Sequence, residues 1–177
     1  PVGLAVGEAI DLRLFLSRWA HAFATVVDNP KGPLPCFQFF DPEGTAIHKI
    51  YVRQPEKRAA WQALVDAWRA EDQGQGFEAK ALPAPKAPRP DAEIDVAALR
   101  ADWAALKDTH DFFPMIRKHK VERRQALRLV GAPFAERVAP DTLTRTLHAA
   151  ADGGVPIMVF VGNPGCLQIH TGPVRKI

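Results

Sequence analysis

Cysteine is scarce in this chain of 177 residues, which contains only Cys36 and Cys166. The two cysteines lie far apart and form no Cys-x-x-Cys pair, so the sequence does not carry the disulfide framework of a small secreted protein. We therefore expect two reduced, buried thiols at small core or strand positions, which points to a cytoplasmic setting.

Long apolar runs and targeting signals are missing as well. No stretch approaches the roughly 20 apolar residues of a membrane span, and the N-terminus shows no signal-peptide pattern, so we expect no membrane insertion. The net charge of +3 is too small to demand a polyanionic partner. No flavin or nicotinamide fingerprint is visible, so an enzyme of this sequence would need electrons from outside.

The histidines lack the spacing of a zinc site. His21, His48 and His148 have no partners at the required intervals, and structural or surface roles are predicted for them. His119 follows two basic residues and is expected to be solvated. His170, on a predicted strand, is a weak candidate for a second metal ligand.

The composition is that of an ordinary globular protein, with 47% hydrophobic and 24% charged residues. The length allows one domain or two small lobes. In the first part of the chain, alternating apolar residues and turn signals predict strands at 9–15, 23–27, 36–40 and 46–52, the last two forming a hairpin around a turn at 41–44. An amphipathic helix is predicted at about 56–70.

A change in composition marks the predicted lobe boundary. Residues 81–90 (ALPAPKAPRP) form a Pro/Ala tract, which favours extended conformations and acts as a semi-rigid spacer. We assign residues 1–72 to a first lobe, 73–95 to a linker and 96–177 to a second lobe.

The second lobe is predicted to begin with helices and to end in a β-hairpin. Helices are expected at 96–106, 110–119, 123–130 and 141–151, and hairpin strands at 157–161 and 166–170. Because an isolated two-stranded hairpin is only marginally stable, further strands must come from elsewhere. The predicted fold class is α+β, an antiparallel sheet with segregated helices.

One segment carries the clearest chemical signal. Residues 108–113 (DTHDFF) place His110 beside two aromatic residues and upstream of a basic stretch at 117–128. An imidazole for iron, apolar cover for a flat ring and cations for anionic edges are together what haem requires. The segment therefore indicates haem as a ligand.

Several segments, in order, resemble a known family. Residues 108–113, 118–121 with 125–129, and 156–174 resemble the second repeat of the HemS/ChuS-type hemin-degrading factors. Residues 11–16, Trp19, 38–41 and 46–51 resemble the end of the first repeat. The resemblance implies two structurally similar lobes of a duplicated α+β fold, incomplete here because the family's opening helices and closing sheet are lacking.

The resemblance implies roles for residues near the predicted ligand. His110 is placed at the axial iron-ligand position of haem b (iron protoporphyrin IX). Arg123 is placed at a haem-contacting position, for a propionate, although a surface arginine with its stem on apolar surface is the alternative. Phe112 and Phe113 lie near the ligand, and core packing is their alternative role.

Three further residues are implied on strands. Arg13 is placed where a first-lobe arginine reaches the haem from the face opposite the histidine, which would put the ligand between the lobes; an exposed strand arginine is the alternative. Met158 and Phe160 share one face of their strand and are candidates to cover the porphyrin. Burial of both strand faces in a core is the stronger reading for these two.

The implied function is haem binding and trafficking in the cytoplasm during bacterial haem uptake and iron acquisition. A haem-uptake transporter, a haem oxygenase or both are the expected protein partners, and a homodimer stays open. A haem-degrading enzyme that uses an external reductant and oxygen is the alternative, and no catalytic residue is assigned. Nucleic-acid binding through the basic helices at 107–128 is a remote alternative.

Overall fold

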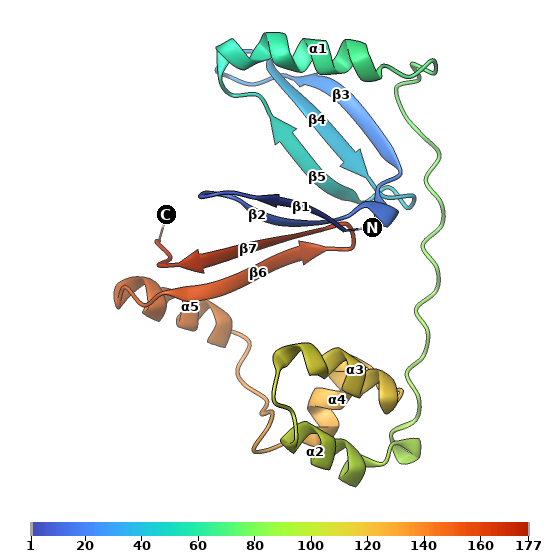
Figure 1. Ribbon diagram of the computed structural model, residues 1–177, viewed down its shortest axis with the longest axis vertical. Coiled ribbons are helices and arrows are strands. Elements are labelled where there is room, and N and C mark those ends of the chain that lie inside the picture. Colours follow the sequence, from blue (N-terminus) through green and yellow to red (C-terminus); the bar gives the residue numbers. More distant parts are fainter. Residues whose placement is uncertain (1, 177) are drawn as a thin grey trace. The chain divides into compact units, whose positions relative to one another are not determined.

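Strands from the two ends of the chain pair in one sheet of the computed structural model, which describes residues 2–176 (Figure 1). The chain divides into two compact units. One unit combines the residues up to Leu82 with those from Leu147 onward, and the other comprises Pro83–Thr146. Strands and helices occupy separate parts of the chain, so the predicted α+β class is confirmed.

The first sheet, which we call sheet A, is four-stranded and antiparallel. Its strands lie in the order β1 (Val2–Val6), β2 (Asp11–Phe15), β7 (Cys166–Gly172) and β6 (Ile157–Asn163). The predicted hairpin is therefore extended by strands from elsewhere, as expected. Strand β1 was not predicted from the sequence.

The pairing of β7 with β2 corrects the predicted lobe ranges. Leu12 lies opposite Gln168, and Leu14 lies opposite Cys166. Because β7 satisfies its outer hydrogen bonds on β2, the hairpin belongs to the same compact unit as the N-terminal strands and not to a lobe spanning 96–177. The assignment of these ranges to two family repeats remains a prediction.

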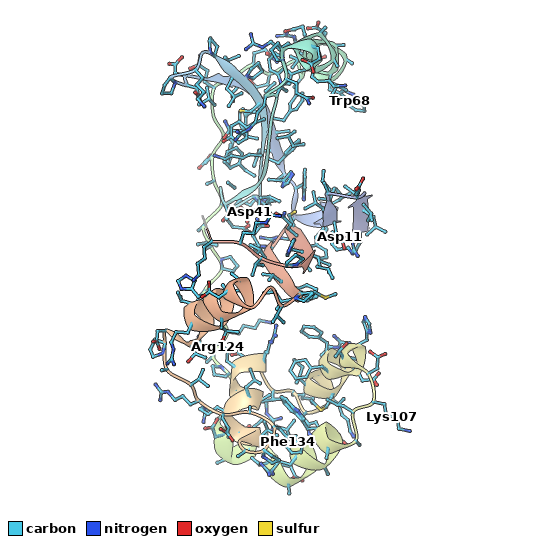
Figure 2. All side chains as sticks on the ribbon, turned by 90° about the vertical axis from the view of Figure 1, so that its left-hand side faces the viewer. Asp11, Asp41, Trp68, Lys107, Arg124 and Phe134 are labelled. Carbon is cyan, nitrogen blue, oxygen red and sulfur yellow. The ribbon has the colours of Figure 1, made fainter. Side chains whose placement is uncertain are left out.

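The second sheet, sheet B, consists of β3 (His21–Val27), β4 (Leu34–Phe40) and β5 (Ala46–Tyr51), with helix α1 (Arg58–Trp68) after it (Figure 1). Trp61 of α1 lies against Phe37 of β4, with ring centroids 5.9 Å apart. Cys36 and Cys166 are both free and buried, which confirms the expected thiols. Asp41 (Figure 2) closes the predicted β4–β5 turn by accepting hydrogen bonds from the backbone nitrogens of Glu43 and Thr45.

The linker in the structure is shorter than the predicted range of 73–95. Phe77 stacks on His21 with ring centroids 3.8 Å apart, and the Lys80 nitrogen donates to the Pro42 carbonyl over 2.8 Å. Residues 77–80, in the first half of the predicted linker and before the Pro/Ala tract, are therefore attached to the first unit. At the other end, Ile94 is only 7% exposed and belongs to the core of the second unit.

The second unit is a small helical cluster, here called the helical unit. It contains α2 (Val96–Ala104), the 3-10 turn η4 (Thr109–Asp111), α3 (Phe112–Lys118) and α4 (Arg123–Val130). Its core is formed by Ile94, Leu99, Met115, Ile116, Val121 and Ala126. The last helix, α5 (Thr142–Asp152), follows it. In residues 2–176, no helix combines the length and apolar character needed to cross a membrane.

Candidate functional site

His110 lies on the η4 turn, and its ring is held by the aspartate two residues earlier. Oδ1 of Asp108 accepts a hydrogen bond from the backbone nitrogen of His110 over 2.7 Å and lies 2.6 Å from Nδ1 of the ring. The bond from the backbone nitrogen, followed in effect by the bond from the ring, lowers the pKa of Asp108 below its usual value. The carboxyl is therefore ionised at neutral pH, and Nδ1 donates the hydrogen bond to it.

The other ring nitrogen of His110 is available. The side chain is 93% exposed, and within residues 2–176 no hydrogen-bond partner is found for Nε2. A neutral imidazole that keeps its proton on Nδ1 presents the lone pair of Nε2, which is the form that ligates a metal. The position can therefore supply one nitrogen ligand to an approaching metal ion.

The two aromatic residues after His110 differ in their surroundings. Phe112 is half-buried and meets Trp103 edge-to-face, with ring centroids 5.1 Å apart. Phe113 is 51% exposed and lies 5.6 Å from the Phe112 ring. Core packing is thus the role of Phe112, whereas Phe113, three residues after His110, offers an apolar surface beside the histidine.

Arg123 is a cation in contact with this aromatic pair. It begins α4, is exposed, and holds its guanidinium carbon 5.9 Å from the centroid of the Phe112 ring. In the described part of the chain it forms no ion pair. The helical unit therefore presents a histidine nitrogen, an exposed phenyl ring and a guanidinium that forms no ion pair with the described residues.

Two other cations of the basic stretch are engaged in ion pairs. Arg128 forms two hydrogen bonds with the carboxylate of Asp91, at 2.6 and 2.8 Å. Lys118 pairs with Asp102 over 2.6 Å, while Lys107 extends away from the helices (Figure 2). Arg128 and Lys118 are therefore less available for a nucleic-acid backbone than the composition of the stretch suggests.

The remaining predicted site residues lie on sheet A. Arg13 is opposite Leu4 on β1 and Leu167 on β7, and Phe160 is opposite Ile169. Directly opposite residues share a sheet face, and the faces alternate along each strand, so Arg13, Phe160 and Met158 lie on one face. Sheet pairing thus brings together residues about 145 positions apart in the chain.

This face of sheet A is open and mostly apolar. Met158 and Phe160 are 58% and 57% exposed, and Leu4 is 66% exposed. The expectation that both faces of β6 are buried in a core is therefore wrong, because the face that carries Met158 and Phe160 is left uncovered by the described residues. Arg13 pairs with Asp11 (Figure 2), which precedes it by two on the same face.

The other histidines do not extend the site. His119 was expected to be solvated, but its side chain is only 10% exposed, and Nε2 bonds to Asp102 over 2.6 Å. His170 lies opposite Val159, on the sheet face away from Met158, so it does not join that surface. Among residues 2–176 there is no cluster of three or more His, Cys, Asp or Glu side chains suited to a metal ion.

Asp108 is the residue of this candidate site that sequence reasoning did not single out. The signal was present, because an aspartate two residues before a histidine can cap the turn that carries it. The hollow of about 430 Å³ in the helical unit does not touch this site; it is lined by Asp102, Ala105, Leu106, Asp111, Pro114, Met115 and Lys118. The candidate site is therefore an exposed surface.

Comparison with protein families gives one match, described as the haemin-degrading HemS/ChuX domain. It covers residues 1–68 and 120–177. Arg13, Arg123, Met158 and Phe160 lie within these stretches, while His110 lies outside them.

Curated relatives and solved structures are similar over nearly the whole chain. The hemin transport proteins HmuS of Yersinia pestis and HemS of Yersinia enterocolitica are 39% and 38% identical over 96% and 95% of the chain. Holo-PhuS, a heme-binding protein from Pseudomonas aeruginosa, matches 99% of the chain with a TM-score of 0.89 and 46% identity. ChuS, a heme degrading enzyme of Escherichia coli O157:H7, matches 99% with a TM-score of 0.82 and 35% identity.

The chain spans only about half the length of these relatives. The chain spans 48% of each of the two Yersinia proteins, 51% of the PhuS chain and 50% of the ChuS chain.

Proposed function

Because the chain belongs to the family of haemin-degrading HemS/ChuX domains, we propose that it binds haem b with His110 as the axial ligand of the iron. The observation that carries this proposal is the state of the histidine. Its Nδ1 is bonded to Asp108, its Nε2 is free within the described residues, and its side chain is 93% exposed. The similar proteins PhuS and HemS, described as heme-binding and hemin transport proteins, support haem as the ligand.

The surroundings of His110 fit the other parts of a haem. Phe113 supplies apolar surface for the porphyrin, and Arg123 supplies a cation for a propionate. An arginine that forms no ion pair in the described part of the chain can bind a propionate without first breaking one. Phe112 then acts indirectly, by fixing the positions of Phe113 and Arg123 on the helical core.

The open face of sheet A is proposed as a further haem-contacting surface. Met158 and Phe160 offer apolar side chains beside Leu4, and Arg13 is a cation on the same face. A flat, apolar ligand with anionic edges would cover this face and pair with its cation. Removing apolar surface from water stabilises such a complex by about 25 cal/mol per Å². This surface is tested separately from the helical unit, with Arg13→Gln and Phe160→Ala.

The first test is a haem titration followed by absorbance, on the wild-type chain and on His110→Ala. We expect a saturable Soret band with histidine-ligated character that is lost or shifted in the variant. His148→Ala, which removes another exposed histidine, is the matched control and should behave as wild type. Identical spectra for the wild-type chain and His110→Ala would contradict the ligand assignment.

The propionate role of Arg123 has its own matched control. Arg124 is the next residue on α4, is also exposed, and forms no ion pair within residues 2–176. Arg123→Gln should weaken haem binding about twofold to tenfold, while Arg124→Gln should leave the dissociation constant unchanged. Equal effects of both substitutions would indicate a general charge effect and reject a specific role of Arg123.

As its role we propose transport: a cytoplasmic carrier that receives haem during bacterial uptake and passes it to a protein partner. The hemin transport proteins of Yersinia support this role, with a haem-uptake transporter or a haem oxygenase as the partner. A homodimer is compatible with it. The test is transfer of haem from the loaded chain to an apo haem oxygenase, which should proceed faster than release of haem into buffer.

Haem degradation is the second candidate, and the similarity to the heme degrading enzyme ChuS favours it. The ring chemistry belongs to the haem, while the protein supplies a ligand and access. Ascorbate under air separates the two roles. A degrading enzyme converts the Soret band stoichiometrically into a product absorbance, whereas a carrier loses no more absorbance than haem on a non-specific protein.

A further inference from the structure

Asp108 is the only side chain in the described residues that holds the ring of His110, and we propose that it is a positioning residue for this histidine. Its carboxylate keeps the imidazole in the Nδ1–H tautomer and directs Nε2 outward. The inference rests on the proposed function in one respect, because it takes His110 as the iron ligand.

The geometry of the turn supports this role. Asp108 is extended, with φ −133° and ψ 142°, and caps the 3-10 turn. One oxygen, Oδ1, reaches both the backbone nitrogen at 2.7 Å and Nδ1 at 2.6 Å. The backbone bond holds the carboxylate in place, so the ring bond does not depend on a freely rotating side chain.

A second aspartate next to His110 makes the arrangement specific. Asp111 follows the histidine directly, yet its side chain makes no capping hydrogen bond at the start of α3. Both carboxylates contribute negative charge close to the ring, but only Asp108 contacts it. Substitution of Asp111 therefore separates the effect of the hydrogen bond from the effect of nearby charge.

The hydrogen bond has a chemical consequence for a metal ligand. A carboxylate that accepts the Nδ1 proton makes the imidazole a stronger electron donor through Nε2. Such a ligand stabilises ferric over ferrous iron, so loss of the carboxylate should raise the reduction potential of bound haem. Loss of such an outer partner weakens metal binding by about 10- to 100-fold in other sites. Because Asp108 is 60% exposed, we expect the lower end, about tenfold.

The decisive experiment needs no haem. Two-bond ¹H–¹⁵N correlation spectra of the histidine rings are recorded on the apo chain at a pH where imidazole is neutral, with His110→Ala used to assign the signal. We expect the Nδ1–H tautomer in the wild-type chain and in Asp111→Asn, and a shift toward Nε2–H in Asp108→Ala. The same tautomer in the wild-type chain and in Asp108→Ala would overturn the inference.

Haem-loaded protein provides the second readout. Asp108→Ala should bind haem about tenfold more weakly and with a raised reduction potential, Asp108→Asn should fall between, and Asp111→Asn should match wild type. Far-ultraviolet circular dichroism confirms that each variant is folded. If His110→Ala leaves the haem spectrum unchanged, the ligand assignment fails while the tautomer result stands. If His110 ligates but Asp108→Ala changes neither affinity nor potential, the positioning role is rejected.

Discussion

Nε2 of His119 lies 2.6 Å from Oδ2 of Asp102 and joins the end of α3 to α2. Lys118 donates to the same oxygen over 2.6 Å. The hydrogen bond from Lys118, followed by that from His119, lowers the pKa of Asp102 below its usual value, so the carboxylate is ionised at neutral pH and accepts both bonds. The His119 side chain is only 10% exposed, which partly shields this contact from water.

Loss of the His119 ring should loosen α3. His119→Ala removes a shielded hydrogen bond and leaves a gap beside the helix, so we expect a lower thermal midpoint and faster amide exchange in residues 112–118. Hydrogen exchange read by mass spectrometry checks this, with His148→Ala, at an exposed position, as the control. Unchanged exchange in α3 would show that the contact contributes nothing to the stability of the helix.

Asp91 should make the free energy of unfolding depend on pH in the acidic range. Hydrogen bonds from Arg128, and then from Gln125, lower the pKa of Asp91 from 3.8 to about 2. A carboxyl whose pKa is lower in the folded state stabilises it above the unfolded-state value, and that contribution is lost as the pH falls from about 4 to about 2. The urea midpoint of Asp91→Asn should therefore lie below that of wild type at neutral pH.

The same pair of proteins provides the test at low pH. The difference between the urea midpoints of wild type and Asp91→Asn should shrink between about pH 4 and pH 2. Asp28→Asn, in an exposed turn, should show no such convergence. A constant difference across this range would show that Asp91 is not the titrating group.

Phe77 should control protease access to Lys80, just before the Pro/Ala tract. Its ring lies among His21, Phe23 and Phe40, with centroids 3.8, 5.8 and 5.7 Å away. Phe77→Ala removes this anchor, so trypsin should cut after Lys80 faster than in wild type. Cleavage after Lys86, beyond the anchored part, is the internal control and should keep its rate. Equal acceleration at both lysines would indicate global unfolding instead.

Gly165 should not accept a side chain. A Cβ there would lie 2.6 Å from two carbons of Ile47, which is 4% exposed. The Gly165 carbonyl also accepts a hydrogen bond from Nε1 of Trp19 over 2.9 Å, which leaves little freedom to move. We expect Gly165→Ala to destabilise by about 1–3 kcal/mol, as overpacking does.

Chemical denaturation of two further variants checks this reason. Gly7→Ala, where nothing lies within 4 Å of the new Cβ, should change stability by less than about 0.5 kcal/mol. In an Ile47→Ala background the penalty of Gly165→Ala should fall, because the clashing carbons are gone. A penalty that is the same in both backgrounds would place its origin elsewhere.

Local sequence signals were sufficient for most individual elements. Helix α4 was predicted with its observed bounds, since an amphipathic segment followed by Gly131 is a signal contained within ten residues. The hairpin of β4 and β5 was predicted from alternation around a turn. The segment with His110 was found from its composition and from a family resemblance, and its role as a ligand stays a prediction.

Contacts between segments far apart in the chain could not be predicted from the sequence. The residues next to His119 in the sequence do not indicate that it bonds to Asp102 and is shielded from water. Those next to Phe77 do not indicate that it stacks on His21. The exposure of Met158 and Phe160 was misjudged for the same reason, because an apolar strand reads alike whether its neighbours cover it or leave it open.

Periodicity and turn signals in the sequence were enough to predict most strands and helices and the chemical groups available to a ligand. The pairing of β7 with β2, and with it the shared sheet face of Arg13 and Phe160, emerged only from the folded chain. The physical reason is that strand register is set by hydrogen bonds between segments far apart in the chain, and a shift of one residue would turn each side chain to the other face.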